Sequence, residues 1–131
     1  MATDDIARES AAQTGAQFAT FFVADLFFGV DVLRVQEVLR FQHMTRVPQA
    51  PGVIEGLINL RGQIVTAIDM RRRLRLPPRA GNQKPMNIVV RGEDGAVSLL
   101  VDEIGDVLDV DEGPLWFDVI HTRYEFHDTR Q

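Results

Sequence analysis

The stretch from Gly56 to Asp69 constrains the fold of this 131-residue chain more than any other part of the sequence. It reads Gly-Leu-Ile-Asn-Leu-Arg-Gly-Gln-Ile-Val-Thr-Ala-Ile-Asp, with side chains that alternate between two sides before and after Gly62. Glycine provides the positive φ or the bulge that a tight bend requires, so the pattern predicts two strands hinged next to Arg61. Asn59 and Arg61 are polar side chains in an otherwise apolar hairpin.

Similar short β-rich runs recur along the chain, separated by turns rich in glycine and proline. They cover residues 18–23, 26–31, 36–42, 86–91, 96–102 and 102–110. Helical pattern is short and includes one turn after Asp31 and a short helix over 70–76 that Asp69 is placed to cap. These runs predict a mostly β protein of the small-barrel class.

Composition restricts the classes of protein that remain. A chain of this length is one domain, or two very small ones that share a core. Cysteine is absent, which excludes disulfides, thiolate metal sites and cysteine nucleophiles. The acidic start lacks the pattern of a secretory segment, and no apolar run approaches the roughly 20 residues of a membrane helix. We therefore expect a soluble, cytoplasmic protein with a disordered tail over residues 1–16.

The net charge of −5 is unevenly distributed. Residues 34–91 hold eleven of the fourteen basic side chains, whereas residues 92–112 hold eight acidic ones and no base. Such an arrangement indicates either pairing within the protein or two docking faces of opposite charge. We take pairing as the default.

No group of residues indicates catalysis or a cofactor. The histidines at 43, 121 and 127 do not have the spacing of a metal site, and serine occurs only at 10 and 98, away from any glycine elbow. No glycine-rich phosphate loop is present. The sequence predicts neither a cofactor nor an enzyme.

Two arginine features leave alternatives open. The basic run Arg71–Arg79 suggests a nucleic-acid-binding barrel, although a solvated helix face explains the run better, because the aromatic residues lie elsewhere. Arg61 at the hairpin tip could be presented outward to a partner, or could be a structural arginine that pairs with Asp69 or Glu37.

Four segments together resemble the CheW-like domain of bacterial chemotaxis coupling proteins. They are Phe-Gly-Val-Asp-Val-Leu-Arg-Val-Gln-Glu-Val at 28–38, the run 46–65 with Asn-Leu-Arg-Gly at 59–62, Ile-Asp-x-Arg at 68–71, and Leu-Leu-Val-Asp-x-Ile-x-Asp-Val-Leu at 99–108. The match covers residues 17–112. It implies two intertwined five-stranded SH3-like β-barrels and a non-enzymatic adaptor that links transmembrane chemoreceptors to the histidine kinase CheA.

The resemblance also implies functional residues. Val35, Glu37 and Arg61 fall where the family contacts the receptor's cytoplasmic tip, with Met86 and Asn87 nearby on the same groove. The hairpin's Asn59 completes the predicted partner-binding set, and Gly56 and Gly62 are expected to serve backbone geometry at turns. The other implied partner is the regulatory domain of the kinase, and the protein is expected to join membrane receptor arrays without inserting into the membrane.

The C-terminal stretch departs from the family. Residues 113–131 lack the glycine-led strand pair with which relatives complete one barrel, so we expect a divergent tail there and one incomplete barrel.

Overall fold

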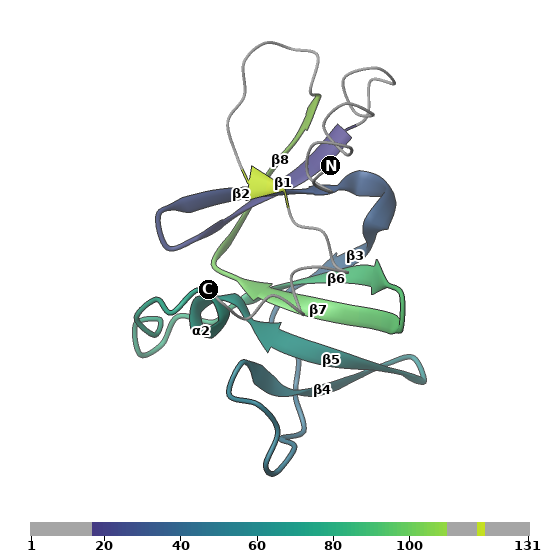
Figure 1. Cartoon of the computed structure of the whole chain (residues 1–131), viewed down its shortest axis with the longest axis vertical. Coiled ribbons are helices and arrows are strands. Elements are labelled where there is room, and N and C mark those ends of the chain that lie inside the picture. Colours follow the sequence, from purple (N-terminus) through teal and green to yellow (C-terminus); the bar gives the residue numbers. More distant parts are fainter. Residues whose placement is uncertain (1–16, 110–117, 120–131) are drawn as a thin grey trace, which may run out of the picture.

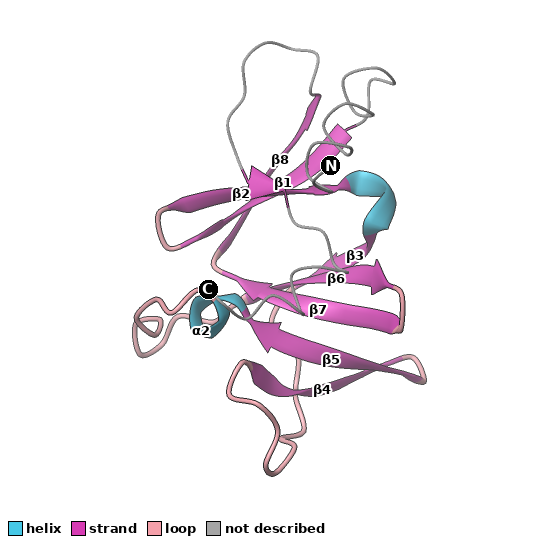
Figure 2. Cartoon of the chain, viewed as in Figure 1, coloured by secondary structure: helices cyan, strands magenta, loops and turns pink. Residues whose placement is uncertain are grey.

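The computed structural model describes residues 17–109 and 118–119, whose strands form two sheets (Figures 1 and 2). The elements in chain order are β1 Gln17–Val23, β2 Leu26–Asp31, the 3-10 turn η1 Val32–Arg34, β3 Val35–Leu39, β4 Ile54–Leu60, β5 Gln63–Asp69, α2 Met70–Arg73, β6 Met86–Gly92, β7 Gly95–Val101, β8 Glu103–Asp109 and β9 Asp118–Val119. The mostly β class is confirmed. Among the described residues, no helix has the length and apolar character needed to span a membrane.

The first sheet has the strand order β8-β1-β2-β9. Strands β1 and β2 form the predicted hairpin, with Phe21 opposite Phe28 and their rings stacked at a centroid distance of 5.5 Å. Strand β8 pairs antiparallel with β1, and β9 pairs parallel with β2 at Phe28. The described residues thus give this sheet four strands, where the resemblance implied five.

The second sheet has the order β3-β6-β7-β5-β4 and closes into a small barrel. Closure comes from the segment after β3, which crosses to the free edge of β4. There Thr45 and Leu57 exchange two backbone hydrogen bonds of 2.9 and 2.8 Å. A closed sheet leaves no long unpaired edge, which is the advantage of a barrel over an open sheet.

The two sheets are intertwined, because the chain leaves the first after β2 and returns to it with β8 (Figure 1). One apolar cluster lies between the sheets and includes Phe21, Phe28, Ile88 and Leu99. A second cluster fills the barrel. Its buried members are Ile58, Leu60, Val65, Ala67, Val89 and Leu100. Successive side chains of β6 and β7 point alternately into the two clusters. The sequences of these strands are therefore almost continuously apolar.

Both predicted aspartate caps are present. The side chain of Asp31 accepts a hydrogen bond from the backbone N–H of Leu33, and that of Asp69 accepts one from Arg71, each at 2.9 Å. The helix after Asp69 is shorter than the predicted 70–76. It ends at Arg73 because Arg75 adopts a left-handed conformation, with a φ of 60°, that an α-helix cannot continue.

The expected N-terminal tail over 1–16 lies outside the described residues. So does most of the expected divergent tail over 113–131, of which only the β9 residues are described.

Candidate functional site

The hinge between β4 and β5 is a tight turn whose two central residues have positive φ. The values are 51° for Arg61 and 90° for Gly62, as a two-residue hairpin turn requires. The side chain of Asn59 accepts a 2.9 Å hydrogen bond from the backbone N–H of Gly62 and fixes the turn. The turn thereby holds Arg61 at the tip, where its side chain is 70% exposed.

Arg61 forms an ion pair with Glu37 of β3. Of the two acids considered as structural partners, Asp69 is engaged elsewhere, with Arg72 and Arg79. Glu37 is only 22% exposed and Arg61 is mostly exposed, so the pair presents its cationic side to solvent. Glu37, Asn59 and Arg61 therefore form one cluster, which we call the hairpin-tip group.

A bulge in β3 separates Val35 from Glu37. Val35 lies opposite Val90 of β6, yet Glu37 lies opposite the adjacent residue, Val89, so that Gln36 is the extra residue. Neighbouring strand residues face opposite sides of a sheet, and Val35 and Glu37 therefore point to opposite faces although they are two positions apart.

Val35 instead shares the outer face of the barrel with Val38 and Met86. Val38 lies opposite Ile88, which alternates with Met86 along β6, and both Val35 and Met86 pack against the cluster between the sheets. The three side chains form what we call the outer-face row. Val38, which is 43% exposed, was not among the contact residues predicted from the sequence. In a regular strand, residues three positions apart face opposite sides of the sheet. Val38 lies on the same face as Val35 only because the bulge inserts an extra residue between them.

Asn87 does not lie on either surface, and its expected role as a contact residue is corrected. The side chain has no exposed area and points into the barrel. Its oxygen accepts a 2.8 Å hydrogen bond from Ser98, and its amide nitrogen donates to the carbonyl of Arg40 at 3.1 Å. Both bonds satisfy a polar group that would otherwise destabilise the core.

The two glycines have different functions. Gly62 provides a positive φ in the turn. Gly56 lies inside β4 and not in a turn as expected, and a Cβ there would stand 2.7 Å from the carbonyl oxygen of Thr45. Gly56 therefore allows the close approach of the segment that closes the barrel.

Arg71 and Arg79, at the two ends of the basic run, are not part of the solvated helix face that we predicted. The Nε atom of Arg71 lies 3.0 Å and Nη2 lies 2.7 Å from one oxygen of Asp102, while Arg79 lies 2.8 Å from the other. The exposed fractions of the Arg71 and Arg79 side chains are 15% and 9%. Pairing within the protein, the default for the uneven charge, is confirmed for these residues, which are unavailable to a nucleic-acid backbone.

Asp102 links the two sheets at the junction between β7 and β8. Its backbone N–H donates a hydrogen bond to the backbone carbonyl of Phe22. Its side chain accepts a 2.5 Å hydrogen bond from the backbone N–H of Ala24 and also accepts the bonds from Arg71 on α2. Burial alone raises the pKa of the Asp102 carboxyl. The Arg71 hydrogen bond, the Ala24 N–H and the two guanidinium charges outweigh burial and hold this pKa below its ordinary value.

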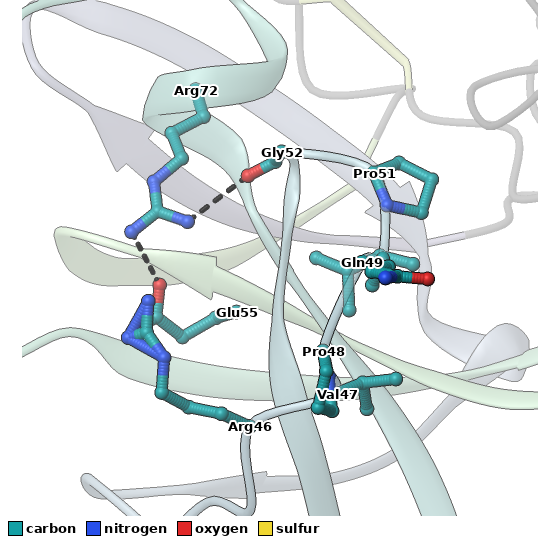
Figure 3. A pocket seen from close by; sticks show the side chains of 10 residues that line it. Arg46, Val47, Pro48, Gln49, Pro51, Gly52, Glu55 and Arg72 are labelled. Carbon is teal, nitrogen blue, oxygen red and sulfur yellow. Dashed lines mark hydrogen bonds and ion pairs between the residues drawn. The ribbon is translucent and has the colours of Figure 1, made fainter.

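A hollow of about 430 Å³ lies between the loop after Thr45 and the start of β4 (Figure 3). Arg72 reaches into it from α2, donates to the carbonyl of Gly52 at 3.0 Å and pairs with Glu55 at 2.7 Å. Figure 3 shows Arg46 and Val47 at its opposite wall. These contacts tie the loop to α2, so Arg72 also has a structural function.

The model of the CheW-like domain matches residues 17–116, which include every described strand except β9, and both candidate surfaces. The chain belongs to the CheW-like family.

Named relatives agree with this assignment. The chain is 34% identical over 103 residues to "Chemotaxis protein CheW" of Bacillus subtilis, covering 79% of this chain and 66% of that protein. It is 33% identical over 94 residues to the protein of the same name from Klebsiella aerogenes, covering 72% and 57%. The chain therefore spans less than two thirds of the length of these relatives.

The CheW-like fold is also found in a solved structure. The "scaffolding protein TtCheW from Thermoanaerobacter tengcongensis" superposes with a TM-score of 0.69 and 31% sequence identity, covering 76% of this chain and 68% of that one. This chain therefore has the CheW-like fold, which is mostly β with two sheets.

Proposed function

We propose that this chain is a non-enzymatic adaptor that couples transmembrane chemoreceptors to a CheA-type histidine kinase in the cytoplasm. Its membership of the CheW-like family supports this function, as do relatives named as chemotaxis proteins and a solved neighbour titled a scaffolding protein. The observation that carries the proposal is the exposed Arg61 guanidinium on a rigid turn of the barrel whose outer face also exposes Val38.

The two surfaces suit a receptor's cytoplasmic tip in different ways. The outer-face row offers apolar side chains, which supply most of the binding energy when a partner buries them. The hairpin-tip group offers a cation fixed in direction by its turn and by Glu37, which sets the partner's orientation and accelerates association. A helical hairpin with an apolar stripe and an acidic side chain would complement both.

The first test is binding of a soluble receptor signalling fragment to Arg61→Ala. We expect an affinity loss of about tenfold, because the exposed cation is removed from the interface. Folding should be nearly unchanged, because alanine and arginine have similar strain at a φ of 51°. Arg75→Ala, another exposed arginine with positive φ, is the matched control and should bind as the wild type does.

A charge exchange distinguishes contact from internal structure. Glu37→Arg combined with Arg61→Glu keeps an ion pair within the barrel but reverses the charge that faces solvent. If Arg61 contacts the receptor, the double variant should bind no better than Arg61→Ala. Restored binding would show that the pair is only structural, and would contradict the proposed contact.

Coupling requires a second partner. Retention of the wild-type chain on a CheA regulatory domain, measured in parallel, tests the adaptor function independently of the receptor surface. A chain that melts cooperatively but binds neither partner would refute the proposal.

A further inference from the structure

We propose that Arg91 positions the receptor-facing surface of β3 without contacting the receptor. This inference rests on the function proposed above. Arg91 lies on β6, and one of its nitrogens, Nη1, donates to the backbone carbonyls of Leu33 at 3.1 Å and Val35 at 3.2 Å. Those carbonyls belong to η1 and to the first residue of β3, directly before the bulge.

The bulge decides what this part of the chain displays. The extra residue, Gln36, places Val35 in the outer-face row and Glu37 in the hairpin-tip group. In a regular strand both would face the same side, and one of the two surfaces would lose its member. The conformation at residues 35–37 therefore sets the relation between the two surfaces.

The bulge is held from both sides. Arg91 fixes the carbonyl of Val35 immediately before Gln36, and the side chain of Gln36 itself donates to Gln63 at the start of β5 with a 2.9 Å bond. Bulges disrupt the regular ladder and leave backbone groups that need other partners. A charged donor shared by two carbonyls provides a stronger restraint than a neutral one.

Arg91 is suited to this function because it is exposed. When Arg91 is replaced, the two carbonyls, whose bonds to it lie at the surface, can bond to water instead. Global stability should change little, whereas the local geometry at residues 35–37 should loosen. Comparing global stability with the local geometry at residues 35–37 therefore distinguishes a positioning function of Arg91 from a general structural function.

The test combines receptor-fragment affinity with amide hydrogen exchange for Arg91→Met and Arg91→Lys in the full chain. For Arg91→Met we expect affinity to fall about 3- to 10-fold and exchange at residues 35–38 to accelerate by a similar factor. The melting temperature and exchange in the β4–β5 hairpin should not change. Arg91→Lys should recover most of the affinity, because an ammonium group can donate to both carbonyls.

The control variant is Arg34→Met. It removes an equal charge from the adjacent turn, where Arg34 is exposed, and no bond to these carbonyls is lost. Equal affinity losses for Arg34→Met and Arg91→Met would show that net charge alone matters, and would overturn the inference. Unchanged binding by Arg91→Met would also overturn it.

Failure of the proposed function has a separate outcome. If the wild-type chain does not bind the receptor fragment, the adaptor proposal fails. Amide hydrogen exchange then tests by itself whether Arg91 restrains residues 35–38. Unchanged exchange at residues 35–38 in Arg91→Met would then refute the positioning of β3 as well.

Discussion

At Gly56, a side chain would meet the backbone that closes the barrel. A Cβ at this position would lie 2.7 Å from the carbonyl oxygen of Thr45 and 3.2 Å from the Cβ of Met44. Backbone in a paired segment cannot move aside without breaking the Thr45–Leu57 bonds. At this scale, the absence of one methyl group decides whether the two edges of the sheet can meet.

We therefore expect Gly56→Ala to lower the free energy of unfolding by about 1–3 kcal/mol through overpacking. Urea denaturation measures the change. Gly52→Ala is the matched control, since nothing lies within 4 Å of a Cβ there, and its effect should stay within about 0.5 kcal/mol. Equal stability of the two variants would contradict a steric requirement at Gly56.

Among the elements, α2 contributes through its charged side chains more than through its length. Its four residues carry Arg71, which bonds to Asp102 and also to the carbonyl of Pro77 at 2.7 Å. A helix this short is not stable by itself, so these contacts and the Asp69 cap hold it in place. The basic run connects α2, the following loop and the β7–β8 junction.

Removing Arg71 should accordingly destabilise the protein strongly. We expect Arg71→Met to cost about 3 kcal/mol, the lower end of the range for one partner of a buried pair, because Arg79 still pairs with Asp102. Arg75→Met, at an exposed site, should cost less than about 0.5 kcal/mol. Thermal melts of the two variants measure the difference, and similar melting temperatures would disprove a structural function for Arg71.

The whole molecule depends on how its two sheets are joined. The apolar cluster between them is non-directional, whereas Asp102 makes directed bonds to the β1–β2 turn and to α2. A buried carboxylate with several donors is a specific link, and its charge makes that link sensitive to acid.

This link predicts a pH dependence of stability. The pKa of Asp102 is lower in the folded than in the unfolded chain, so unfolding takes up protons as the pH falls below about 4, the ordinary aspartate value. The stabilisation is complete above that value and is lost as the pH falls through the folded pKa. Asp102→Asn should be less stable at pH 7, and its stability should decline less steeply as the pH falls below about 4. Equal slopes in urea titrations of the two proteins would contradict this account.

Local sequence determined much of the fold. The alternation around Gly62 gave the β4–β5 hairpin, the phenylalanine-rich runs gave β1 and β2, and Asp31 and Asp69 marked the two helical turns. These features depend on backbone preferences within a few residues, which the sequence displays directly. The Asn-Leu-Arg-Gly motif likewise identified the family and placed Arg61 at an exposed tip.

Tertiary structure alone decided the remaining features. The bulge at Gln36, the burial of Asn87 and the pairing of Arg71 with Asp102 each depend on strands or turns far apart in the chain. Their register follows from packing two apolar clusters against shared strands, and no local pattern encodes it. The sequence by itself therefore determined the elements and the family, and the three-dimensional packing determined which side chains those elements present to a partner.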